Sequence, residues 1–104
     1  MLITPEIREL QAVIALVHEH GFAGAAKSLG VSQPSVSMRI AKLEQIFGFT
    51  LFHRRPEGNV LTEEGMRLLP IIRNINSEYN SLLSRVSYWR RAQNKTLKIL
   101  ADGS

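Results

Sequence analysis

Two residues, Gly30 and Val31, are all that separate one predicted helix from the start of the next. Ser32 can cap the second helix with its hydroxyl, and Pro34 fits the first turn, where no intrahelical donor is needed. Gly48 is placed to end this helix. So short a connection predicts a tight helix-turn-helix, although helix pairs with glycine turns also occur in structural bundles.

The helix that begins at Ser32 has two different faces. Its apolar residues recur at steps of four, three and four and should face a core: Val36, Ile40, Leu43 and Phe47. The rest of its surface is small, hydroxylated and cationic: Gln33, Pro34, Ser35, Ser37, Met38, Arg39 and Lys42. Taken alone, this would be an ordinary solvated surface. Beside a helix-turn-helix, it is a candidate DNA-binding surface.

Two further helices should precede this one. Thr4 followed by Pro5 is typical of a helix start, with Thr as the cap and Pro at the first helical position. This first helix should run to His20 and stop at Gly21. A short second helix should run from Phe22 to Leu29, ending at Gly30.

After Gly48 the spacing of apolar residues changes to alternation. Residues 50–53 and 60–62 are short β-prone runs, and residues 54–59 supply turn residues between them, which predicts a two-stranded wing. Two strands are marginal alone, so we expect Leu51, Phe52 and Leu61 to pack on the helical core. Arg54 and Arg55 suit phosphate or minor-groove contact, with solvated loop cations as the alternative.

The longest predicted element is a helix capped by Thr62, with Glu63 and Glu64 in its first turn. Pro70 should bend it. Apolar residues occur along it at alternating steps of four and three, which we call the apolar seam: Leu68, Ile72, Ile75, Tyr79, Leu82, Val86 and Trp89. A 3.5-residue repeat of this length predicts a helix wrapped by a partner, and a second copy of the chain is the economical one.

Three regions result. Residues 1–62 form a mainly α winged helix-turn-helix with three helices, and residues 63–93 form the long dimerisation helix. Residues 97–101 are predicted to be a β-strand, for which residues 102–104 offer no partner strand. We therefore expect residues 94–104 to begin a further domain.

The composition excludes several classes of function. The formal charge is +4 with a pI near 10.0, which favours an anionic partner, but residues 1–62 hold six Lys/Arg against five Asp/Glu. The cations gather in residues 33–55. There is no cysteine, and the three histidines are badly spaced for a metal. Neither a membrane span nor a secretory leader is evident, so we expect a cytoplasmic protein.

The whole pattern resembles the LysR-type transcriptional regulators over residues 5–101. The residues that carry the resemblance are Phe22, Ala25, Ala26, Leu29, Val31, Ser32, Gln33, Pro34, Ser37, Ile40, Leu43, Glu44, Leu51, Phe52, Arg54, Leu61, Thr62, Glu63 and Gly65. The resemblance implies a winged helix-turn-helix that dimerises through the long helix. It also implies a full-length protein that binds a small-molecule effector in a separate domain and commonly forms a tetramer, with no cofactor in this part.

By position, the resemblance places Gln33, Pro34 and Ser37 at the DNA bases and Arg54 at the backbone beside the wing. Met38 stands where the family often has Arg, so a bidentate base contact should be absent or moved to Arg39, and Met38 could instead meet a thymine methyl group.

Ala23 and Gly24 depart from the family in a second place. They replace the Thr or Ser and the longer polar residue that are frequent at the start of the second helix. This departure weakens the phosphate contact expected there.

Three alternatives stay open at this point. The DNA-binding half of a molybdate-responsive regulator has a similar architecture, and a winged helix can also bind a partner protein. An enzyme is the least expected class, because the sequence has no paired carboxylates, nucleophile–base pair, metal cluster or glycine-rich phosphate loop.

Overall fold

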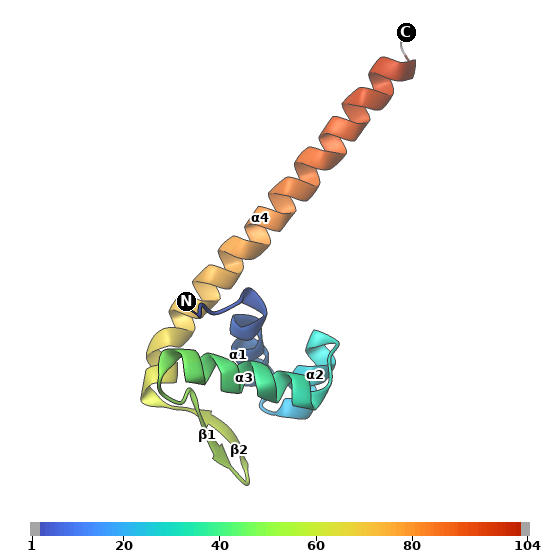
Figure 1. Cartoon of the computed structure of the whole chain (residues 1–104). Helices are drawn as coiled ribbons and strands as arrows, with labels where there is room; N and C mark the ends of the chain where they lie inside the picture. The colour runs from blue at the N-terminus through green and yellow to red at the C-terminus, as the bar shows by residue number, and fades with distance from the viewer. Residues whose placement is uncertain (1–2, 103–104) are drawn as a thin grey trace.

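The computed structural model describes the backbone of residues 3–102 and the side chains of residues 3–94. Within that range the elements occur in the predicted order of three helices, a hairpin and a long helix (Figure 1). Their bounds are α1 Ile7–Glu19, α2 Phe22–Leu29, α3 Gln33–Phe47, β1 Phe52–Arg55, β2 Gly58–Leu61 and α4 Glu63–Asp102. The winged helix-turn-helix with a long final helix is therefore confirmed.

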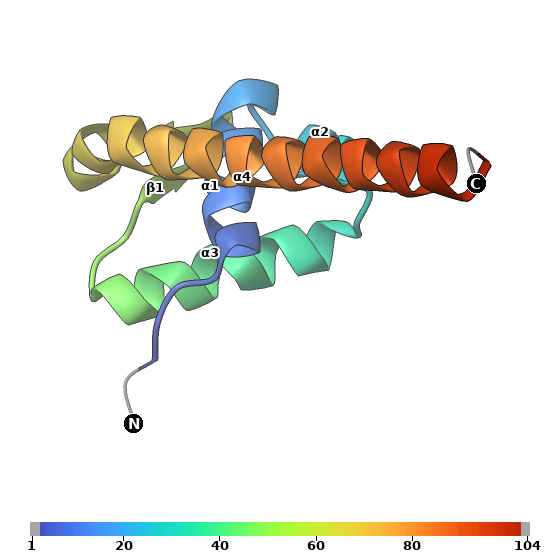
Figure 2. The same ribbon diagram turned by 90° about the horizontal axis from the view of Figure 1, so that it is seen from above.

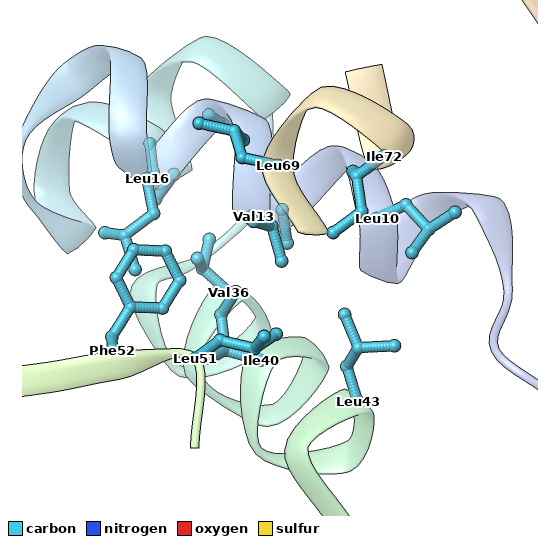
Figure 3. Packing of buried hydrophobic residues seen from close by; sticks show 14 residues of the cluster. Leu10, Val13, Leu16, Val36, Ile40, Leu43, Leu51, Phe52, Leu69 and Ile72 are labelled. Carbon is cyan, nitrogen blue, oxygen red and sulfur yellow. The ribbon is translucent and has the colours of Figure 1, made fainter. Parts of the chain in front are cut away.

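One hydrophobic core joins these elements. Figure 3 shows side chains from α1, α3, the start of the wing and α4 converging on one another. The predicted face of α3 is buried at Val36, Ile40 and Leu43. Seen from above, α1 lies between α3 and α4 (Figure 2), so both outer helices pack against it. The position of α3 is thus set by α1.

The first helix begins two residues later than predicted. Its N-cap is Glu6, and the backbone N–H of Glu6 donates to the carboxylate of Glu9 at 2.8 Å. The Glu6 side chain in turn accepts from the backbone N–H of Glu9, so the two residues form a capping box. This pair satisfies free N–H donors at the helix start, and Thr4 takes no part in it. The start at Thr4 and Pro5 was therefore wrong. At the other end, His20 rather than Gly21 adopts the left-handed conformation, with φ of 63°.

The helix-turn-helix forms as predicted. Gly30 ends α2 in the left-handed conformation with φ of 70°, and the N–H of Val31 donates to the carbonyl of Ala26 at 3.0 Å. Ser32 then caps α3, because its hydroxyl accepts from the N–H of Ser35 at 3.3 Å. Gly48 ends α3. These local hydrogen bonds fix the angle between the two helices.

The wing is a hairpin with a shorter turn than predicted. β1 and β2 are antiparallel, with Phe52 opposite Leu61 and Arg55 opposite Gly58. Arg54 and Arg55 therefore lie in a strand, which corrects their assignment to the turn. The reason is that Gly58, with φ of 135°, lets the chain reverse within two residues. Leu51 and Phe52 are buried and Leu61 is partly buried, which confirms the packing of the wing on the core.

The last helix is longer than predicted. Thr62 caps it through an accepted hydrogen bond from the N–H of Gly65 at 3.0 Å. It continues through residues 94–102, so the strand predicted at residues 97–101 was wrong. A strand needs a neighbouring strand for its backbone groups, whereas a helix pairs its own. Residues 103–104 lie outside the described part of the chain. The helix projects well beyond the core, and the molecule measures 67 × 31 × 25 Å (Figure 1).

Candidate nucleic-acid interface

The exposed face of α3 carries the predicted contact residues. Gln33 and Pro34 lie exposed in the first turn, and Met38 is 72% exposed one turn later. Ser35, Ser37 and Arg39 are partly exposed beside them. The N-terminal half of α3 therefore presents a continuous polar surface with one apolar side chain at its centre. Its dimensions suit a major groove, which admits one helix.

The two serines at the start of α3 bond to each other. The Ser32 and Ser35 hydroxyl oxygens are 3.0 Å apart, and the Ser32 hydroxyl also accepts from the N–H of Ser35. Ser32 thus has a structural role as a cap. Gln33, on this turn, and Ser37, one turn later, have no side-chain partner among the described residues, so their hydrogen-bonding groups are available to a ligand.

Lys42 is placed differently from its neighbours. Its Nζ lies 3.2 Å from Oε2 of Glu9 and 3.7 Å from Oε1 of Glu6, so it bridges α3 to the start of α1. Pairing with Glu9, and then with Glu6, raises the pKa of Lys42 above its ordinary value. The pKa of Glu6 is lowered by Arg8, whose Nε lies 2.8 Å away, and by Lys42. Lys42, whose side chain is 49% exposed, is therefore paired with carboxylates of its own chain at the surface of α3.

Arg54 lies at the edge where the wing meets α2. Its guanidinium carbon is 5.5 Å from the centre of the Phe22 ring, and Phe22 is the first residue of α2. Among the described residues, no side chain caps the N-terminus of α2, so the N–H groups of its first turn have no side-chain acceptor. Both features attract a phosphate. Arg55 is also exposed but points to the other face of the hairpin, because side chains alternate along a strand.

Sequence reasoning missed two carboxylates that hold α3 in place. Glu9 is one of them, and it is 2% exposed. The other is Glu44, whose Oε2 accepts from the N–H of Leu51 at 2.6 Å and of Phe52 at 3.3 Å. A signal existed for Glu9, because a Glu three residues after a cap is typical of a capping box. For Glu44 the signal was that α3 has no other carboxylate.

The apolar seam of α4 divides into two parts. Ile72 is 3% exposed in the core of its own chain, and Leu68 packs beside it. Ile72 is therefore not available to a partner, which corrects its place in the predicted interface. Beyond it the seam is open: Ile75 is 46%, Leu82 57% and Trp89 63% exposed. Val86 is also exposed and Tyr79 is partly buried.

Neither a metal-ligand cluster nor a membrane-spanning helix is found among the described residues. No group of three or more His, Cys, Asp or Glu side chains among them is placed to hold a metal ion. None of the described helices combines the length and apolar content that crossing a bilayer requires.

Comparison with known proteins identifies the family. Residues 7–66 match the family described as bacterial regulatory helix-turn-helix protein, lysR family. The chain belongs to the LysR family. The HTH-type transcriptional regulator DmlR of Escherichia coli (strain K12) is 32% identical over 98 residues, which are 94% of this chain and 32% of DmlR. The chain thus spans about a third of that relative.

Two solved structures that resemble the chain are complexes of LysR-type domains with DNA. The CbnR DBD–DNA complex matches with a TM-score of 0.68 and 34% identity over 84% of this chain and 95% of that chain. The BenM DBD bound to benA site 1 DNA matches with a TM-score of 0.72 and 29% identity over 80% of this chain and 96% of that chain.

These findings confirm three expectations. The chain is a LysR-type helix-turn-helix DNA-binding domain, its fold is the predicted one, and its relatives are transcriptional regulators rather than enzymes.

Proposed function

We propose that this chain binds double-stranded DNA sequence-specifically as a homodimer, and that it is the DNA-binding part of a longer regulator. The observation that carries the proposal is the exposed polar face of α3, and the edge between Arg54 and the start of α2 adds a second candidate contact. The face of α3 suits base contacts, and the edge suits phosphate contacts. The DNA complexes of BenM and CbnR support the same ligand class for this chain.

The open part of the apolar seam supports the homodimer. From Ile75 to Trp89 the seam extends about 20 Å along α4, at 1.5 Å per residue. Within the described residues no other element covers this stretch. A second α4 would cover it and place two α3 surfaces on one duplex, in successive major grooves.

The remaining features of the whole protein belong to the same proposal. The chain covers 32% of DmlR, which leaves room for the effector-binding domain that the family resemblance implies. A small-molecule effector, assembly into tetramers and a cytoplasmic location are proposed on that basis. The described residues indicate no particular class of effector.

A salt titration tests the phosphate contact. If Arg54 binds a phosphate, Arg54→Ala should weaken binding to every duplex alike and reduce the slope of log affinity against log salt by about one. The matched control is Arg85→Ala, because Arg85 lies about 30 Å along α4 from its start. A loss confined to one sequence, or an equal change in the control, would contradict this role.

A second comparison tests base contact by α3. Gln33→Ala and Ser37→Ala should relax the preference at particular base pairs, by about 1–3 kcal/mol for each good hydrogen bond. Equal losses on the preferred and on random duplexes would count against base contact. Failure of the unmodified dimer to bind any duplex at low salt would favour a protein partner for this surface.

A further inference from the structure

The ion pairs of Lys42 lie within the surface proposed to meet DNA. A shallow groove between the start of α1 and the exposed face of α3 is lined by Glu6, Arg8, Ser35, Met38, Arg39 and Lys42. Carboxylates are unexpected here, because each would repel a phosphate a few ångströms away. Their presence inside a cationic surface therefore needs a reason.

Both oxygens of the Glu9 carboxylate have a partner within the chain. Oε1 accepts from the N–H of Glu6 at 2.8 Å, and Oε2 lies 3.2 Å from Nζ of Lys42. The Glu9 side chain is 3% exposed, so water cannot replace either partner. A buried charge that loses its partner is strongly unfavourable. Lys42 therefore remains paired with Glu9 and is not free to contact a phosphate.

Glu6 extends the same restraint to the surface. Its Oε1 lies 3.7 Å from Nζ of Lys42, while its Oε2 lies 2.8 Å from Nε of Arg8. Unlike Glu9, it is about half exposed. Glu6 therefore offsets the charge of two cations where a phosphate would otherwise approach them.

We propose that Glu9, assisted by Glu6, is a specificity-determining residue that keeps Lys42 out of the set of phosphate contacts. The inference rests on the proposed DNA binding. Phosphate contacts strengthen binding to all sequences equally, whereas base contacts distinguish them. By removing one cation from the phosphate-contacting set, the Glu9–Lys42 pair lowers affinity for random DNA and leaves the base contacts of α3 intact.

The salt slope on a random duplex measures this directly. Lys42→Met keeps the apolar stem but leaves the buried Glu9 carboxylate without its cation, so it should lower the melting temperature. The slope measured on the folded variant should equal that of the unmodified protein, in contrast to Arg54→Ala. Glu9→Gln keeps an acceptor for the N–H of Glu6 but removes the charge. It should free Lys42, increase the slope by about one and raise random-duplex affinity at low salt. Glu6→Gln should act in the same direction by a smaller amount.

A double variant separates this role from a merely structural one. In Glu9→Gln combined with Lys42→Met, the slope should return to that of the unmodified protein, since the freed cation is gone. Lys42→Arg should keep the pair and change nothing. Thermal unfolding of each variant establishes that it is folded, and Glu6→Gln, at an exposed site, replaces Glu9→Gln if the latter does not fold.

The results that contradict the inference differ from those that contradict DNA binding. A slope reduced by about one in Lys42→Met, or an unchanged slope in both glutamine variants, would show that Lys42 is not withheld by its carboxylates. In that case Arg54→Ala would still reduce the slope and the DNA-binding proposal would stand. If the unmodified protein binds no random duplex at low salt, the DNA-binding proposal itself fails.

Discussion

Glu44 connects the α3 helix to the wing through one carboxylate oxygen. This oxygen accepts from the N–H groups of Leu51 and Phe52. Glu44→Ala should leave both partly buried donors unpaired and reduce the free energy of unfolding by about 1–3 kcal/mol. Chemical denaturation measures the loss. Glu44→Gln is the matched control, because its amide oxygen can still accept. Equal stability of the two variants would contradict this role.

Glu6 gives the surface a pH dependence. Its pKa is lowered below the ordinary value of 4.5, first by Arg8 and then by Lys42. A lowered pKa in the folded state contributes stability above pH 4.5, and this contribution is lost as the pH falls through the folded-state pKa. The unmodified protein should therefore exceed Glu6→Gln in thermal stability at about pH 7, and the difference should shrink steadily as the pH falls below 4.5. A pH-independent difference would contradict this.

At the scale of residues, the sequence predicted the side chains with local partners. Ser32, Gly30 and Gly48 were assigned correctly because a cap bonds within one turn of its own helix. The ion pairs of Lys42 were not predicted, because its partners lie on another helix. The spacing of residues within α3 gives no sign that Glu9 of α1 pairs with one of its side chains.

Gly65 sets how closely α4 packs against the wing. A Cβ at this position would lie 2.5 Å from the carbonyl oxygen of Leu51 and 2.9 Å from Cδ2 of Leu61. Gly65→Ala should therefore reduce the free energy of unfolding by about 1–3 kcal/mol, although Ala is the better helix former by about 1 kcal/mol. The exposed neighbour Glu64→Ala is the control. A melting temperature that rises in Gly65→Ala would show that the close approach does not matter.

At the scale of elements, the helices were easier to predict than the segments that connect them. The bounds of α2 were correct, since Gly21 precedes Phe22 and Gly30 comes after Leu29, and both glycines are clear stop signals. The start of α1 was misplaced because Thr4–Pro5 and Glu6–Glu9 are competing caps. The residues at 97–101 suit either a strand or a helix, and tertiary context decides between these.

The long helix determines how two chains can meet. Leu82 is 57% exposed in the open part of the seam. Leu82→Asp should place an unpaired charge in the interface and raise the dimer Kd by at least ~100-fold. Sedimentation measures the oligomeric state. Ser84→Asp, on the opposite side of α4, is the control and should remain dimeric. An intact Leu82→Asp dimer would remove the argument from the seam.

At the scale of the whole molecule, α4 and the winged helix-turn-helix are connected by a hydrogen bond. The Gln11 amide donates to the side-chain oxygen of Asn76 at 3.1 Å, which holds α1 against α4. Because α1 also carries α3, the direction of α4 and the orientation of the DNA-binding surface are linked. Heptad spacing predicted the length of the seam, but it could not show that Ile72 belongs to the core of one chain.

Selection of binding sites from a pool of random duplexes tests the central claim most directly. If two copies pair along α4 and present both α3 surfaces to one duplex, the purified chain should enrich two similar half-sites related by two-fold symmetry. Their centres should lie one helical turn, or a multiple of it, apart. Enrichment of single half-sites without a two-fold partner, or no enrichment at all, would contradict the account.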